Sequence, residues 1–191
     1  RMAVQEMTTW ERLRHTLEEL GPTFVKFGQI LSLRGDLLPA ELIKELEKLQ
    51  DSVAPVSFEE IMGVLQKALK KPLDQIFSLI DEEPLAAGSL AHVHRAVLKD
   101  ENVPVALKIR RPDIVRTVEV DLQILEGAAP MLCEHIEFAR TYDFVNLVKE
   151  LKRALLRELN FTLEARNMQI VSQALSGEKD VIIPEVCGDY V

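Results

Sequence analysis

The sequence LAAGSLAHVHRA at residues 85–96, followed by VALK at residues 105–108, decides how this chain folds. The first stretch predicts two β-strands joined by a turn of small residues, and the second predicts a third strand that ends in Lys108. Residues 86–89 are all Ala, Gly or Ser, so their backbone can approach phosphate oxygens without hindrance from bulky side chains. Lys108 adds a compact positive charge that such oxygens bind. Together the two stretches favour a nucleotide site over a plain structural hairpin.

The spacing of the small residues matches the phosphate loop of protein kinases, which reads G-x-G-x-x-G-x-V. Ala86, Gly88 and Ala91 stand at the three glycine positions, and Val93 stands at the valine. Residues 105–108 match the V-A-I-K signature of the third kinase strand with one conservative change. Each pattern alone has little specificity, but their order and spacing support each other.

Composition excludes several classes of protein. The 31 acidic and 23 basic residues give a formal net charge of −8, which argues against a general nucleic-acid surface. A hydrophobic fraction of 47% in 191 residues is enough for the core of one or two domains. Cys133 and Cys187 form no disulfide framework and no metal spacing, so we expect reduced thiols in a cytosolic setting. The sequence shows no signal-peptide pattern and no apolar run of the roughly 18 residues that a membrane-spanning helix needs.

Apolar residues at helical spacing predict four helices in the first 72 residues. Gly21-Pro22 separates the first two helices, because Gly ends a helix and Pro is favoured at the first position of the next. Ser57 and Glu60 form a capping box that starts the fourth, and Pro72 ends it. The expected ranges are 1–20, 23–33, 39–49 and 57–71.

From Gln75 onward the hydrophobic period changes to that of strands, which predicts a small antiparallel meander. Helical periodicity then returns, interrupted near Gly127 and Pro130. A leucine at every fourth position predicts one long helix after that, and an aliphatic run predicts a final strand. The expected strands are 76–80, 85–98, 103–109 and 181–186, and the expected helical segments are 113–138 and 144–176.

Four short motifs follow one another along the chain: KFGQ at residues 26–29, AAGS at 86–89, VALK at 105–108 and ELN at 158–160. They resemble the K-x-G-Q motif, the alanine-rich loop, the strand-three lysine and the E-x-D motif of the UbiB family (AarF/ABC1-type) of atypical protein-kinase-like proteins. Glu164 resembles the helix-C glutamate of that family, and residues 20–26 and 37–39 also fit it. The resemblance covers nearly the whole chain in consistent order.

The resemblance implies an α+β fold, in which a protein-kinase-like N-lobe with a small antiparallel sheet and a long helix C follows an N-terminal helical extension. The extension would span residues 1–72 and the N-lobe residues 73–191, with an inserted helical segment over about 113–140. Kinases carry their catalytic-loop aspartate and asparagine and their D-F-G aspartate in the C-lobe. We expect that lobe to lie outside this chain, so these residues alone should show no turnover.

The resemblance also implies cofactors and partners. The family binds ATP or ADP with Mg²⁺, and it supports isoprenoid-quinone biosynthesis or lipid homeostasis as an ATPase or a small-molecule or lipid kinase. Expected partners are an adenine nucleotide and quinone-biosynthesis proteins or lipids, but no nucleic acid. The expected location is cytoplasmic, with membrane association through parts outside this chain left open. The alternative is a non-catalytic pseudokinase-type nucleotide-binding module or a helical interaction module.

The candidate site residues fall into three groups. Lys108 should hold phosphate oxygens and pair with a helix-C glutamate. An ordinary kinase places that glutamate roughly twenty residues further on, which favours Glu126; the resemblance favours Glu164, and we predict Glu164 because Glu126 precedes a Gly-Ala-Ala-Pro run. The predicted catalytic residues are Lys108 and Glu164, the cofactor-binding residues are Ala86, Ala87, Gly88, Ser89, Val93, Ala106 and Lys108, and the regulatory residues of the extension are Lys26, Gln29, Glu158 and Asn160.

Glu158 and Glu164 are six residues apart, so on a regular helix they diverge by about 120° and cannot share one role. We therefore predict that Glu164 meets Lys108 and that Glu158 meets Lys26 and Gln29. Gly28, between Lys26 and Gln29, would permit a close approach of the backbone, at a cost of about 1 kcal/mol in helix propensity.

Two residues depart from the family pattern. Gly88 replaces an alanine, which would loosen nucleotide selectivity, and Asn160 replaces the aspartate of E-x-D, which puts direct metal contact by that residue in doubt. His92 and His94 alternate along a strand and share a face, as two zinc ligands would. No third ligand follows at a suitable spacing, so we predict no metal ligand in this chain.

Overall fold

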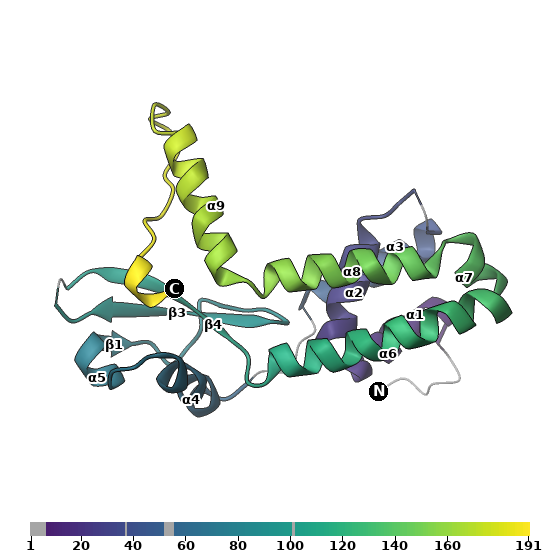
Figure 1. Cartoon of the computed structure of the whole chain (residues 1–191), viewed down its shortest axis with the longest axis horizontal. Helices are drawn as coiled ribbons and strands as arrows, with labels where there is room; N and C mark the ends of the chain where they lie inside the picture. Colours follow the sequence, from purple (N-terminus) through teal and green to yellow (C-terminus); the bar gives the residue numbers. More distant parts are fainter. Residues whose placement is uncertain (1–6, 37, 52–55, 101) are drawn as a thin grey trace.

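The computed structural model describes residues 7–36, 38–51, 56–100 and 102–191. It has the α+β fold that the sequence predicts (Figure 1). The molecule is elongated, with a small sheet at one end and a group of helices at the other, and one helix projects from the middle. Residues 1–6 of the expected first helix and Leu37 of the expected family motif lie outside the described residues.

The helices are α1 (Thr9–Leu20), α2 (Pro22–Ser32), α3 (Ala40–Glu47), α4 (Phe58–Ala68), α5 (Leu73–Ile76), α6 (Ile114–His135), α7 (Glu137–Thr141), α8 (Phe144–Glu158) and α9 (Phe161–Ala174), with 3-10 turns η2 (Lys48–Asp51) and η3 (Gly188–Tyr190). The strands are β1 (Phe77–Ile80), β2 (Ala86–Ala87), β3 (Ala91–Leu98) and β4 (Pro104–Arg110). No helix of the described residues is long and apolar enough to cross a membrane.

The sheet is built on β3, and the predicted antiparallel meander is confirmed. Strand β4 pairs with β3 along its length, from Ala91 opposite Arg110 to Val97 opposite Pro104. Strands β1 and β2 share the other edge: β1 pairs with the end of β3 and β2 pairs with its beginning. Strands β1 and β2 therefore follow each other along one edge of β3, and β4 lies along its other edge.

Helix α4 covers one face of the sheet. The predicted capping box is present, since the Ser57 hydroxyl accepts from the Glu60 amide and the Glu60 carboxylate accepts from the Ser57 amide. The apolar stripe of α4 packs into a core with both sheet edges, formed by Ile61, Leu65, Ile76, Phe77, Ala96 and Ile109. Helix α4 lies in the predicted extension, yet it shares this core with the sheet. The predicted domain boundary at residue 72 therefore stays a prediction.

Helices α1, α2 and α3 form a second core with η2, made of Leu17, Val25, Leu42, Leu46 and Leu49. Gly21, with φ +104°, separates α1 from α2 in a conformation that L side chains rarely adopt. Gly28 lies where α2 meets this core. A Cβ at this position would overlap Leu49 Cδ1 and would stand 3.2 Å from Leu17 Cδ1. The predicted close approach at Gly28 is therefore confirmed, and it is an approach of leucine side chains from α1 and η2.

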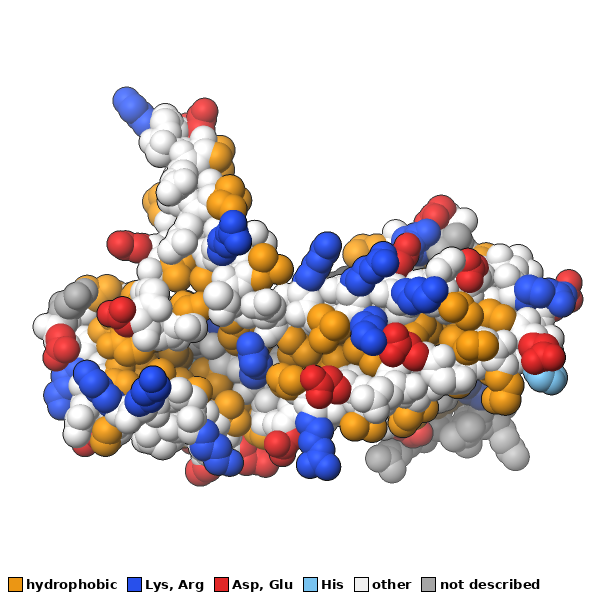
Figure 2. All heavy atoms as spheres, viewed as in Figure 1, with side chains coloured by type: hydrophobic (Ala, Val, Ile, Leu, Met, Phe, Trp, Pro, Cys, Tyr) orange, Lys and Arg blue, Asp and Glu red, His pale blue; other side chains and the backbone are white. Residues whose placement is uncertain are grey.

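Helices α6 and α8 pack along each other and join the other parts of the molecule. Their core contains Val118, Leu122, Leu151 and Leu155, and it also takes in Phe27 of α2 and Leu90 of the loop before β3. Figure 2 shows hydrophobic side chains among basic and acidic ones on the exposed surface of this pair. Helix α2 thus packs against both the leucines of its own group and the α6–α8 pair.

The predicted interruption near Gly127 and Pro130 is wrong, because α6 runs unbroken through both residues. A Gly costs about 1 kcal/mol and a Pro about 3 kcal/mol in an isolated helix, but tertiary burial of a helix face outweighs such preferences. Ala129, which lies between the two, is almost fully buried. Long-range packing therefore decides this helix.

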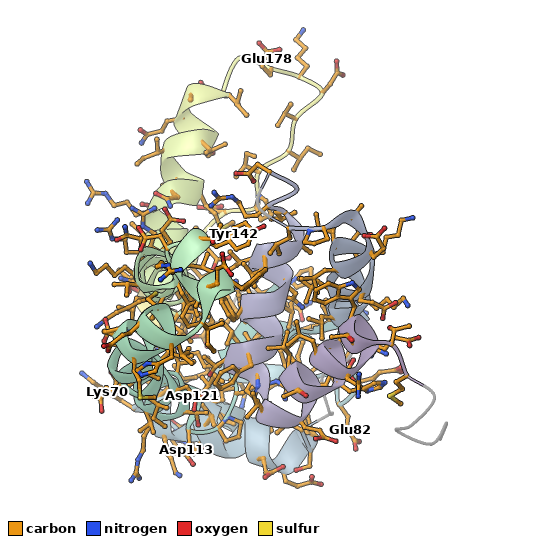
Figure 3. All side chains as sticks on the ribbon, turned by 90° about the vertical axis from the view of Figure 1, so that its right-hand side faces the viewer. Lys70, Glu82, Asp113, Asp121, Tyr142 and Glu178 are labelled. Carbon is orange, nitrogen blue, oxygen red and sulfur yellow. The ribbon has the colours of Figure 1, made fainter. Side chains whose placement is uncertain are left out.

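The predicted single helix over 144–176 is also wrong, since the chain turns at Leu159 and Asn160 and forms two helices, α8 and α9. Leu159 is buried in the core of the α6–α8 pair, whereas α9 has no buried residue and projects from the body. Figure 3 shows Glu178 beyond the outer end of this projecting helix. The leucine repeat therefore extends into α9, where no hydrophobic core buries it.

The predicted strand over 181–186 does not form in the described residues. This segment returns from the tip of α9 toward the sheet, where Tyr190 approaches Phe77 with ring centroids 6.4 Å apart. Ile182 in the middle of the segment is 90% exposed. A strand needs a neighbour for its backbone groups, and no strand of the described residues pairs with this segment.

The close approach at Gly28 gives a test of the fold. We expect Gly28→Ala to lower the free energy of unfolding by about 1–3 kcal/mol, because overpacking outweighs the gain of about 1 kcal/mol in helix propensity. Gly127→Ala is the matched control: a Cβ there meets nothing within 4 Å, so the same change should be neutral or stabilising. Urea unfolding of both variants measures the difference, and equal effects would contradict the packing at Gly28.

Candidate functional site

A cleft of about 510 Å³ opens where α2, the turn between β2 and β3, and the end of α8 meet. Segments that are far apart in the sequence form its walls: α2, the turn with its flanking strands β2 and β3, β4, the end of α8 and the start of α9. From α2 come the two polar residues of the K-x-G-Q motif, from the turn come small residues, and from β4 comes the predicted lysine. The lining residues are Lys26, Gln29, Ile30, Leu33, Ala86, Gly88, Ser89, Leu90, Ala91, Val93, Lys108, Glu158 and Phe161.

Lys108 forms an ion pair with Glu164. Its Nζ donates to the two carboxylate oxygens of Glu164 at 2.8 and 2.6 Å. The predicted contact is therefore present, and it joins the end of β4 to the first turn of α9. Glu126, the alternative partner, instead accepts from Lys152 of α8, with both oxygens 2.9 Å from Nζ.

Phe161 was not predicted from the sequence, yet it lines the cleft beside this ion pair. Lys108 Nζ lies 4.9 Å from the centre of its ring, and Arg110 Cζ lies 5.0 Å from it. Lys108 and Arg110 are two residues apart on β4 and so share a face of the strand. A cation over an aromatic ring is attracted to the ring's negative face. Phe161 therefore attaches α9 to both cations of β4.

The turn before β3 is held by its own backbone and by the start of the next connection. The Gly88 amide donates to Ala91 O at 2.9 Å, and the Arg111 amide donates to Leu90 O at 3.0 Å. The Arg111 side chain adds a third bond, from Nε to Gly88 O at 2.9 Å. The Ser89 amide donates to no residue that the structure describes. An amide with no protein partner on the wall of a cleft is available to an anion.

The extension contributes an ion pair across the cleft. Lys26 Nζ of α2 donates to Glu158 Oε1 at the end of α8, at 2.7 Å, as predicted. The second predicted contact of Glu158 is wrong, because the Gln29 amide donates to the carbonyl of Leu49 in η2, at 3.0 Å. Gln29 still lines the cleft, but this bond ties α2 to its own helical group.

Asn160 begins α9. Its Oδ1 accepts from the Leu163 amide at 3.0 Å, so the side chain serves as the N-cap of the helix. An asparagine oxygen fills this position as well as an aspartate oxygen would. Asn160 thereby fixes the direction of the turn that carries Glu164 toward Lys108. Its predicted regulatory role stays a prediction.

Four of the predicted site residues lie off the cleft. Glu164 lines a neighbouring groove of about 700 Å³ between α8, α9 and the C-terminal segment. The others are not among the residues that line either cavity. They are Ala87, Ala106 and Asn160.

His92 and His94 lie on the face of β3 that is turned away from the cleft, and both are buried. Their rings stack with centroids 6.0 Å apart, and His94 Nδ1 lies 2.9 Å from Asp81 O. Burial lowers the pKa of His92, and the Arg111 guanidinium adds to this effect. Among the described residues no group of three potential ligands surrounds them. The two histidines therefore belong to the interior of the lobe.

Comparison with known proteins agrees with this architecture. The family described as "ABC1 atypical kinase-like domain" matches residues 48–191. The chain is 39% identical over 184 residues to "Probable protein kinase UbiB" of Aliivibrio fischeri (strain ATCC 700601 / ES114), which covers 96% of this chain and 34% of the relative. The protein of the same name from Vibrio parahaemolyticus is 40% identical over 180 residues, or 94% of this chain and 33% of the relative. The chain thus spans about a third of the length of these relatives.

The ion pair across the cleft can be tested by charge reversal. We expect Lys26→Glu and Glu158→Lys each to lower stability, and the double variant to recover roughly 0.5–1 kcal/mol through the restored pair. The side chains are 22% and 39% exposed, so the coupling should stay within that range. Urea unfolding of the four proteins gives the coupling energy, and strictly additive losses would contradict the contact.

Proposed function

The chain belongs to the ABC1 atypical kinase-like family, and on that premise we propose that its cleft binds the phosphates of an adenine nucleotide, ATP or ADP. The observation that carries this proposal is that Lys108 and Ser89 line one cleft, with the Lys108 ammonium group and a Ser89 amide that has no partner among the described residues. Both are donors that phosphate oxygens accept from, and both are positioned by other contacts.

The proposed roles follow from position. Lys108 binds phosphate oxygens, and Glu164 holds the lysine toward the cleft, as the corresponding pair does in protein kinases. The turn from Ala86 to Ser89 passes over the phosphates. Val93, on the cleft face of β3, offers an apolar surface to the adenine ring. We propose Ala106, which does not line the cleft, as a second residue beside that ring.

Divalent metal would enter with the nucleotide. Among the described residues that line the cleft, Glu158 is the one carboxylate, and it already pairs with Lys26. Mg²⁺ prefers carboxylate and phosphate oxygens in octahedral geometry, and a single paired carboxylate does not provide such a site. We therefore assign no Mg²⁺ ligand to these residues and derive no step through the ion.

The helical extension would act as a regulatory wall. Helix α2 forms one side of the cleft, and the Lys26–Glu158 pair fastens that side to the end of α8. Bound phosphates would meet Lys26 as well as Lys108, so the extension can sense whether the cleft is filled. We propose this role for Lys26, Gln29 and Glu158, which line the cleft, and for Asn160 through the turn between α8 and α9 that it caps.

For the whole protein we propose an atypical kinase or ATPase that supports isoprenoid-quinone biosynthesis. The name UbiB of the relatives motivates the link to quinones. Phosphoryl transfer or hydrolysis would require a catalytic aspartate and metal-binding aspartates of the kinase type. Among the described residues that line the cleft there is no aspartate. The proposed contribution of residues 1–191 is nucleotide binding and its regulation.

The role of Lys108 can be tested by nucleotide affinity. We expect Lys108→Met to weaken Mg-ATP binding about ten-fold or more, because a charge-assisted hydrogen bond to phosphate is lost. Lys152→Met is the matched control, since that lysine also pairs with a glutamate and is similarly exposed, 42% against 37%. Isothermal titration and thermal shift measure both. A wild-type protein that shows no shift with Mg-ATP favours the helical interaction module, and binding without turnover in the full-length protein favours the pseudokinase.

Gly88 can be tested in the same assay. A Cβ at this position would lie 3.4 Å from Ala91 O, an ordinary contact, so Gly88→Ala should fold normally. We expect the variant, which restores the alanine typical of the family, to change the ratio of ATP to ADP affinity. Unchanged affinities for both nucleotides would exclude a role of Gly88 in selectivity.

A further inference from the structure

Arg111 is a buried cation behind the phosphate loop. Only 8% of the residue is exposed, and within the described part of the chain its side chain makes one hydrogen bond, from Nε to Gly88 O. Nη2 is buried without a partner, and the guanidinium has no carboxylate partner among the described residues. Burial lowers the pKa of this group. Since an unpaired charge is costly to bury, the position of Arg111 needs a reason other than stability.

The surroundings of Arg111 do not neutralise its charge. His92 is the titratable neighbour on β3, and burial together with the guanidinium favours its neutral form by lowering its pKa. The Nε2 atoms of His92 and His94 are likewise buried without partners. The loop carbonyl of Gly88 is therefore the main group on which the positive charge acts.

That carbonyl belongs to the same peptide as the Ser89 amide. In a trans peptide the C=O and the N–H point in opposite directions. With Gly88 O directed at Arg111, the Ser89 N–H is directed away from Arg111, and Ser89 is a lining residue of the cleft. A cation on the carbonyl also polarises the peptide, which makes its N–H a stronger donor.

We propose that Arg111 is a positioning residue that orients and polarises the Gly88–Ser89 peptide so that the Ser89 N–H binds a phosphate oxygen. This inference rests on the proposed function of the cleft. Arg111 does not line the cleft, and it acts through the loop alone. Its backbone amide, which donates to Leu90 O, joins the same turn from its other end.

A purely structural role makes a different prediction from a positioning role. If Arg111 served stability, its removal would unfold the lobe. Removing a buried cation that has no carboxylate partner instead relieves the cost of keeping a charge out of water, which can offset the lost bond to Gly88 O. We therefore expect Arg111→Met to unfold at the same urea concentration as the wild type, while its loop at residues 86–91 is held less firmly.

The experiment compares the full chain with Arg111→Met, Arg111→Lys and the control Arg116→Met, which removes an exposed arginine five residues on. Hydrogen exchange of the segment 86–91 is measured by mass spectrometry without nucleotide, and the affinities for ATP and adenosine are measured by titration. In Arg111→Met we expect the Gly88 amide to exchange about ten-fold faster, because the loop opens more often. ATP should bind about five- to twenty-fold more weakly, and adenosine less than two-fold.

Arg111→Lys keeps the charge but loses the planar donor group, so it should lie between the wild type and Arg111→Met. If Arg111→Met fails to fold, Arg111→Lys replaces it in the comparison with the wild type. The proposal is overturned if loop exchange stays at the wild-type rate, or if ATP and adenosine lose affinity equally. If the wild type binds no nucleotide, the proposed function fails, and the exchange measurement still decides whether Arg111 holds the loop.

Discussion

The ion pair between Lys108 and Glu164 is the contact on which the arrangement of the site depends. Helix α9 has no buried residue, so the hydrophobic cores that hold the rest of the molecule do not hold this helix. Its attachment to the sheet consists of the Lys108–Glu164 pair and the ring of Phe161 beside Lys108 and Arg110. The same lysine faces the cleft, so the group that would bind phosphate also orients α9.

Hydrophobic packing and polar contacts have separate tasks in this molecule. Three cores fix the sheet with α4, the first three helices, and the α6–α8 pair. Phe27 links α2 to the last of these, which brings the K-x-G-Q residues to the edge of the cleft. The lining of the cleft combines apolar side chains with polar groups that the cores hold in place: two ammonium groups, a carboxylate and a turn of small residues.

The sequence was sufficient for the motifs and insufficient for the path of the helices. The small-residue turn and the lysine of β4 follow local patterns, and the K-x-G-Q and E-x-D residues follow a family resemblance, so their meeting in space could be anticipated. The pairs of Glu158 and Glu164 were predicted from one continuous helix, which is wrong; the two glutamates part because the chain turns at Asn160. Asn160 is a good N-cap residue, but the leucine repeat around it hid that signal.

The continuity of α6 and the absence of a strand at 181–186 depend on long-range partners. Phe161 and Arg111 were missed for the same reason, since only the folded chain brings them to β4 and the loop.

The attachment of α9 has a consequence for how the protein responds to its solution. Lys108 and Glu164 are 37% and 43% exposed, so water and dissolved ions reach their contact. At an ionic strength of 0.15 M the Debye length is about 8 Å, and it shortens further as salt is added. The buried leucines are insensitive to this screening, while the tether of α9 is weakened by it. The orientation of α9 relative to the sheet therefore depends on the salt concentration, unlike that of the helices packed in the hydrophobic cores.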